Sequence, residues 1–202
     1  MRLMLILLVP GIILMSTYSR PIINIFYGMK YIDAAYPMSI LAYGVGFLTI
    51  FYVMSFVMNG AGKTKIPMWI SIIGVAINAI LNYILIQKYA LVGSAIATSI
   101  TSFVAMVFML YYLYKDFNVI ISLKSFLKIM LAGFLMYCAS LLFYRGEFIF
   151  ILWSVILFAF YLFILYLLQG ITKDDLAILC SIISKKKKEE VEGEFSGNEP
   201  SA

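Results

Sequence analysis

The chain has 202 residues, of which 64% are hydrophobic and 12% are charged, and its formal net charge is +5. Soluble domains carry about 25% charged residues, so this composition excludes an ordinary soluble fold. Hydrocarbon offers no partner for a free backbone amide, and each membrane segment must therefore satisfy its own hydrogen bonds as a helix. We predict an all-α, polytopic membrane helix bundle.

Six apolar segments fill most of the chain: residues 3–19, 37–58, 66–86, 93–114, 126–144 and 148–168. Each reaches or approaches the roughly 20 residues that a helix needs to cross about 30 Å of hydrocarbon. A secretory signal is the alternative for the first segment, but the residues before Ser19 lack a clean small-x-small cleavage site and favour an anchor. We expect residues 1–170 to form a six-helix transmembrane domain. Residues 171–202 should be a cytoplasmic tail, disordered from about residue 185 because its charges, Gly and Pro leave nothing to bury.

The positive charges of the loops predict the orientation. With both termini in the cytoplasm, the inner side holds eleven basic residues and the outer side holds four, which are Arg20, Lys30, Lys88 and Arg145. The inner set consists of Arg2, Lys63, Lys65, Lys115, Lys124, Lys128, Lys173 and the lysines at 185–188. We therefore expect a multi-pass protein of the cell membrane with cytoplasmic N- and C-termini.

The residues that support catalysis are scarce. The sequence has no His, and its ten acidic residues all lie in predicted loops or in the tail. A proton relay or an ion path lined by carboxylates normally needs such groups within the span. We also expect neither a disulfide nor a metal site from Cys138 and Cys180, which lie in different environments. We predict a protein that is not an enzyme and that uses no cofactor and no metal.

The turn between the second and third segments contains Gly62, Lys63 and Thr64, which resemble the end of a phosphate-binding P-loop. That loop needs Gly where this chain has Val57, and it follows a β-strand rather than a membrane helix. We therefore expect no nucleotide. The structural interpretation is a cytoplasmic turn in which Gly ends one helix, Lys stays in water and Pro begins the next helix. Its residues are Asn59, Gly60, Gly62, Lys63, Lys65 and Pro67.

The third and fourth segments are expected to form an antiparallel hairpin that faces the bundle. In the fourth, Gly93, Ala97, Thr101 and Ala105 recur every four residues, and small residues at this spacing let helices approach closely. The loop between the two segments, residues 87–92, is short enough for antiparallel pairing. The fifth and sixth segments are bulky all round and are expected at the periphery, facing lipid.

Polar residues at membrane depth are the candidate site. One interpretation is that they line a cavity for a polar headgroup or a cation. The other interpretation is that they form hydrogen bonds between helices, which contribute about 0.6 to 2 kcal/mol each. For the threonines, the hydroxyl can instead donate a hydrogen bond to a backbone carbonyl of its own helix. These candidates are Ser71, Asn78, Asn82, Thr98 and Thr101.

Residues 21–114 resemble a known family. The hallmarks are an N-G-x-G-K-T-K-x-P turn at residues 59–67, the asparagines at 78 and 82, and a K-Y-x-L-V-G-S-A-I-A-T run at residues 88–98. Together they are similar to the C-terminal half of polysaccharide flippases of the multidrug and lipid-linked-oligosaccharide exporter superfamily, including the stage V sporulation protein B type. The resemblance implies that the six segments correspond to helices nine to fourteen of a fourteen-helix transporter.

Such transporters move lipid-linked oligosaccharide or polysaccharide precursors across the membrane between two helical lobes. The resemblance implies partners of three kinds: membrane lipids, a lipid-linked glycan, and a separate N-terminal half or homologous chain, since we expect this chain to be incomplete alone. It implies no nucleic-acid or nucleotide partner. Some relatives build a sodium site that would carry over to Asn78, Asn82 and Thr98. A structural or assembly subunit without transport activity is the alternative. A membrane transferase is less favoured, because its chemistry usually needs carboxylates or His near the interface.

Overall fold

The computed structural model describes residues 2–117, 123–142 and 150–167, and within these ranges the chain is helical without a β-strand. The prediction of an all-α fold is confirmed for this part, whereas the predicted tail lies outside it. The elements are α1 (Arg2–Thr17), α2 (Ser19–Tyr27), the 3₁₀ helix η1 (Met29–Ala34), α3 (Ala35–Gly60), α4 (Lys65–Phe117), α5 (Leu123–Leu142) and α6 (Phe150–Leu167).

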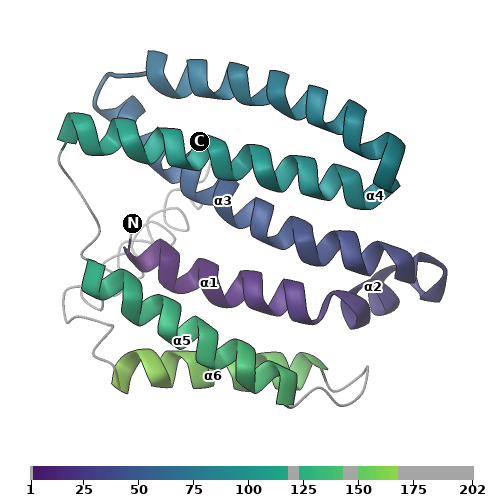
Figure 1. Cartoon of the computed structure of the whole chain (residues 1–202). Coiled ribbons are helices and arrows are strands. Elements are labelled where there is room, and N and C mark those ends of the chain that lie inside the picture. Colours follow the sequence, from purple (N-terminus) through teal and green to yellow (C-terminus); the bar gives the residue numbers. More distant parts are fainter. Residues whose placement is uncertain (1, 118–122, 143–149, 168–202) are drawn as a thin grey trace, which may run out of the picture.

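Helix α4 is a hairpin of two helical arms. Its 53 residues are interrupted by a non-helical residue, Ala90, with φ 48° and ψ −127°. We call residues 65–89 the first arm and residues 91–117 the second arm, and Figure 1 shows the second arm returning beneath the first. Next to the turn, a Cβ atom on Gly93 would overlap the backbone carbonyl of Leu85. The predicted antiparallel hairpin is confirmed, and its connection is shorter than the predicted loop because glycine lets the arms meet.

Two described helical stretches, Met29–Gly60 and Lys65–Phe117, are long and apolar enough to cross a membrane. A third crossing results if Met4–Thr17 and Ser19–Tyr27, which meet at 72°, count as one bent span. Leu127–Leu141 and Leu152–Leu167 are shorter apolar helices. Because α4 folds back on itself, it contains two of the predicted segments. The total of six transmembrane helices stays a prediction.

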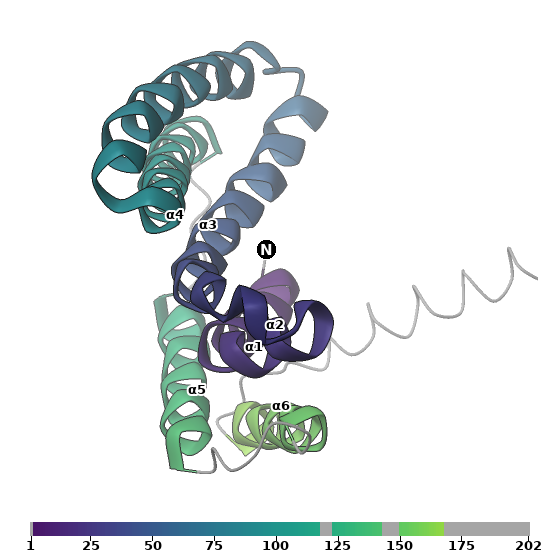
Figure 2. The same ribbon diagram turned by 90° about the vertical axis from the view of Figure 1, so that its right-hand side faces the viewer.

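The helices bury two hydrophobic cores. One lies between α1, α5 and α6 and is centred on the fully buried side chains Ile129, Met136, Tyr161 and Leu165. The other lies between α3 and the second arm and is centred on the buried Phe51, Met54, Met58, Met109 and Leu113. In Figure 2, α5 and α6 lie on one side of α1 and α3, and α4 lies on the other. Helix α6 is thus at one edge of the bundle, with a buried inner face.

Only half of the hairpin faces the bundle as expected. A Cβ atom on Gly44 of α3 would lie 2.9 Å from the Cα atom of Ser99 in the second arm, which is too close for any side chain. The Ser99 hydroxyl also donates a hydrogen bond to the Ile40 carbonyl at 3.2 Å. The first arm is instead largely exposed, with side chains such as Val75 and Tyr83 more than 70% accessible. The expectation that both arms face the bundle is therefore corrected for the first arm. The reason is that the small residues that allow close packing are concentrated on the second arm.

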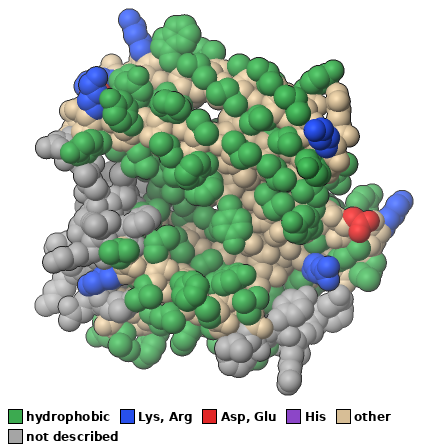
Figure 3. Space-filling model, in the orientation of Figure 1, with side chains coloured by type: hydrophobic (Ala, Val, Ile, Leu, Met, Phe, Trp, Pro, Cys, Tyr) green, Lys and Arg blue, Asp and Glu red, His purple; other side chains and the backbone are tan. Residues whose placement is uncertain are grey.

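Basic side chains gather at the two opposite ends of the helices, and hydrophobic side chains cover the surface between them (Figure 3). One end holds the α3–α4 turn, the last turn of α4 and the start of α5, with Lys63, Lys65, Lys115 and Lys128. The other end holds α2, η1 and the α4 turn, with Arg20, Lys30 and Lys88. This separation matches the two predicted sets of charges. Which end faces the cytoplasm stays a prediction.

Candidate functional site

The α3–α4 turn ends α3 in a Schellman motif. Gly62 adopts φ 76°, its amide donates to the Asn59 carbonyl at 3.0 Å, and the Lys63 amide donates to the Met58 carbonyl at 3.0 Å. These two bonds satisfy carbonyls that a helix end otherwise leaves without a partner. Asn59 and Gly60 are exposed, and Pro67 is buried in the first turn of α4. The geometry of this turn therefore agrees with the structural interpretation of the glycine-lysine motif.

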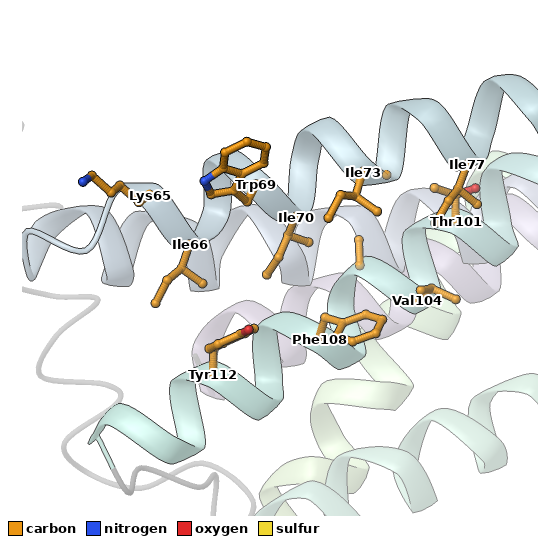
Figure 4. Close-up of a pocket in the computed structure, with 12 residues that line it drawn as sticks. Lys65, Ile66, Trp69, Ile70, Ile73, Ile77, Thr101, Val104, Phe108 and Tyr112 are labelled. Atoms are coloured by element: carbon orange, nitrogen blue, oxygen red, sulfur yellow. The ribbon is translucent and has the colours of Figure 1, made fainter.

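The two lysines of the turn differ in their surroundings. The Lys63 ammonium lies 2.9 Å from the Asp116 carboxylate and 5.4 Å from the centre of the Phe117 ring. Lys65 is exposed and has no carboxylate partner among the described residues. The Lys65 side chain stands instead at one end of a cavity between the two arms of α4 (Figure 4).

This cavity, which we call the hairpin groove, has a volume of about 470 Å³. Its walls come from both arms and are almost entirely apolar, and Figure 4 shows isoleucines of the first arm opposite Val104 and Phe108 of the second. The lining side chains are Lys65, Ile66, Trp69, Ile70, Ile73, Gly74, Ile77, Thr101, Val104, Ala105, Phe108 and Tyr112. The groove therefore suits a hydrocarbon chain better than a polar solute.

The deep end of the hairpin groove meets a polar cluster that consists of Asn78, Asn82 and Thr101. The Asn82 side-chain amide donates to Asn78 Oδ1 at 2.8 Å and to the Asn78 backbone carbonyl at 3.0 Å. The Asn78 amide reaches Thr101 Oγ1 across the two arms at 3.5 Å, which is a weak contact. Thr101 Oγ1 donates to the Ala97 carbonyl at 2.9 Å. Most of these bonds are local to one helix.

One atom of the polar cluster is buried without a partner. Asn82 Oδ1 is inaccessible to solvent and accepts no hydrogen bond from the described residues. A buried polar atom without a hydrogen bond destabilises a fold by about 1 to 3 kcal/mol. The contacts within the described helices therefore do not explain why an asparagine occupies position 82. The predicted roles in a cavity or a cation site stay predictions for this cluster.

The other two candidates lie outside the polar cluster. Thr98 is half-buried on the second arm, and Ser71 is exposed on the first. Ser71 does not line the hairpin groove, although Ile70 and Gly74 do. The groove face is built from residues three or four apart, and Ser71 is turned about 100° from its neighbour Ile70 around the helix. Ser71 therefore lies outside the hairpin groove, and its predicted role at a bundle or cavity face stays a prediction.

A second cavity, of about 630 Å³, lies among four helices. We call it the four-helix cavity. It is lined by α1, α3, the second arm and α5, for example by Leu8, Ile50, Leu113 and Phe134, and its polar lining comes mainly from tyrosines such as Tyr43. Sequence reasoning missed it because the walls are far apart in the chain. The available signal was Gly46 and Gly133, where a Cβ atom would collide with Ile12 and Val9 of α1.

Comparisons with known proteins agree with a membrane protein. Residues 1–168 match the family described as Lipid II flippase MurJ. An uncharacterized membrane protein, MJ1068, from Methanocaldococcus jannaschii is 31% identical over 129 residues, which are 64% of this chain and 25% of that protein. The chain thus spans about a quarter of the length of the curated relative it matches. No solved structure matches the chain. Because the family match extends over most of the sequence, the chain belongs to the lipid II flippase MurJ family, within the exporter superfamily that its turn and asparagine motifs predicted.

Proposed function

We propose that this chain is part of a flippase that moves a lipid-linked oligosaccharide or polysaccharide precursor across the cell membrane. Family membership supports a flippase, and flippases of this family are transporters rather than enzymes. The observation that carries the proposal is the apolar four-helix cavity, whose walls of Leu, Ile, Val, Met and Phe match the hydrocarbon part of a lipid-linked substrate.

The distribution of charge supports transport of a lipid rather than of an ion. Asp33 and Asp116 are the acidic residues of the described part, and both lie near helix ends. Ion or proton pathways usually place ionisable groups inside the membrane. We propose that the glycan headgroup is handled by other helices and that this chain holds the lipid.

We further propose that the described helices correspond to helices nine to fourteen of a larger transporter, with both termini in the cytoplasm. The chain spans only a quarter of the length of its relative MJ1068, and this supports the proposal that further helices complete the transporter. These helices would come from a separate N-terminal half or a homologous chain. The N-G-x-G-K-T-K-x-P turn supports a polysaccharide flippase of the stage V sporulation protein B type as the nearest kind.

The test is to co-express this chain with an N-terminal flippase half in a strain that lacks flippase activity. Leu8 lines the four-helix cavity, whereas its neighbour Leu7 is exposed and does not. Leu8→Trp should narrow the cavity and abolish complementation, and Leu7→Trp should complement like the unmodified chain. Purified complexes of equal yield would show that both variants assemble.

Two results would argue against transport. In the first, the complex assembles fully but never moves a lipid-linked glycan, and the chain is then a structural or assembly subunit. In the second, the Leu8→Trp complex assembles and transport continues unchanged, which would remove the four-helix cavity from the mechanism.

A further inference from the structure

The hairpin groove has the depth of one membrane leaflet. Its lining extends along the first arm from Lys65 to Ile77, and along the second from Tyr112 back to Thr101. Twelve residues at about 1.5 Å per residue give a length of about 18 Å, close to half of the hydrocarbon thickness of about 30 Å. A chain that entered at Lys65 would therefore end near the centre of the bilayer.

The open end of the groove carries an unneutralised positive charge. Lys63 shares its charge with Asp116, but Lys65 has no carboxylate partner in the described part of the protein. Trp69 and Tyr112 line the groove close to the same end, and such amphipathic rings are typical of the headgroup level. An entrance of this kind is complementary to an anionic headgroup on an apolar tail.

At the deep end of the groove the apolar lining gives way to polar side chains of the two arms. Gly74 and Thr101 lie opposite each other, and a Cβ atom on Gly74 would make an ordinary van der Waals contact, at 3.8 Å, with the Thr101 methyl group. One turn further on, Asn78 contacts Thr101 across the arms. The apolar lining ends at Ile77, so an acyl chain of one-leaflet length matches it better than a longer polyprenyl chain, which would extend past these polar side chains.

We propose that the hairpin groove binds an anionic phospholipid from the surrounding leaflet. Its phosphate would pair with Lys65, and one acyl chain would lie between Ile73 of the first arm and Phe108 of the second. Such a lipid would cover the exposed face of the first arm and hold the two arms at their observed spacing. This inference does not depend on the transported substrate and survives if the proposed flippase function fails.

The test is native mass spectrometry of the full chain in detergent, titrated with phosphatidylglycerol or with phosphatidylcholine of the same acyl chains. Phosphatidylglycerol should bind more tightly. Lys65→Gln should weaken its binding about fivefold, the ratio that corresponds to about 1 kcal/mol for one lysine near an anionic surface. Lys115→Gln is the matched control, since Lys115, in the last turn of α4, lies at the same end of the hairpin as Lys65 but does not line the groove.

A second pair of variants tests the acyl chain. Ile73→Trp places a large ring in the groove and should reduce phosphatidylglycerol binding tenfold or more. Ile72→Trp adds the same ring at an exposed neighbouring position outside the groove and should leave binding unchanged. If either tryptophan variant fails to stay monodisperse, the lysine pair alone decides.

Three results would overturn the proposal. They are equal binding of the two phospholipids, equal effects of Lys65→Gln and Lys115→Gln, and displacement of phosphatidylglycerol by a polyprenyl diphosphate at equal concentration. The last result would assign the groove to the carrier lipid.

Discussion

The Lys63 ammonium lies 2.9 Å from the Asp116 carboxylate and joins the α3–α4 turn to the last turn of α4. The two residues are 53 positions apart in the chain, yet they meet because the hairpin brings the start of the first arm and the end of the second to the same side of the bundle (Figure 1). The pair closes the hairpin at its open end, where the arms have no glycine contact to hold them.

Removing this ion pair should loosen the open end of the hairpin slightly. Lys63 is 44% exposed and Asp116 is 18% exposed, so we expect Lys63→Gln to lower the free energy of unfolding by about 0.2 to 1 kcal/mol. A double-mutant cycle with Asp116→Asn, followed by thermal unfolding in detergent, measures the coupling. The effect should shrink at high salt, and an additive double mutant would show that the pair is not coupled.

Substituting Gly44 should separate α3 from the second arm. Gly44→Ala places a methyl group against the Ser99 backbone, and overpacking of this kind costs about 1 to 3 kcal/mol. Gly60→Ala is the control in the same helix, because nothing lies within 4 Å of its added Cβ atom. A lower unfolding temperature for Gly44→Ala but not for Gly60→Ala is expected. Equal temperatures would contradict the close approach of α3 and α4.

Two substitutions at the turn of α4 should change the stability of the protein in opposite directions. Ala90 adopts a positive φ, which is strained for alanine and unstrained for glycine, so Ala90→Gly should stabilise the protein by about 1 kcal/mol or more. Gly93→Ala should destabilise it, because the new methyl group would meet the Leu85 carbonyl. Thermal unfolding of both variants tests the pair, and the turn geometry is wrong if Ala90→Gly lowers the unfolding temperature.

The two asparagines should differ in their contribution to stability. Asn78→Leu removes the only described side-chain contact of this cluster between the two arms and should cost about 0.6 to 1.7 kcal/mol. Asn82→Leu removes bonds within one helix and also removes a buried oxygen without a partner, so we expect little change. Chemical unfolding in mixed micelles measures both. A larger loss for Asn82→Leu would indicate a contact outside the described residues.

The charge distribution predicts which end faces the cytoplasm. Lys63→Cys and Lys88→Cys, each made in a background in which Cys138 and Cys180 are serine, should react differently with a thiol reagent that does not cross the membrane. We expect labelling of position 88 in intact cells and of position 63 only after lysis. The reverse pattern would invert the orientation inferred from the loops.

Local signals in the sequence were sufficient for several features. Apolar runs predicted helices, the order of Gly62, Lys63 and Pro67 predicted the turn, and the short loop before Gly93 predicted the hairpin. These features depend on neighbouring residues, because helix formation, capping and turn geometry are decided within a few positions of the chain. The local signals did not indicate that the first arm would be largely exposed, or that α1 and α2 would meet at a bend of 72°.

The sequence by itself determined that this is an all-helical chain suited to a membrane, with basic turns at the helix ends and a family motif at residues 59–67. The tertiary structure alone decided that α3 packs on the second arm, that Lys63 pairs with Asp116 while Lys65 meets no carboxylate among the described residues, and that the hairpin groove and the four-helix cavity form. The physical reason is that each of these features depends on which helix faces touch. In a chain that is apolar on nearly every face, hydrophobic periodicity does not distinguish a buried face from one that meets lipid.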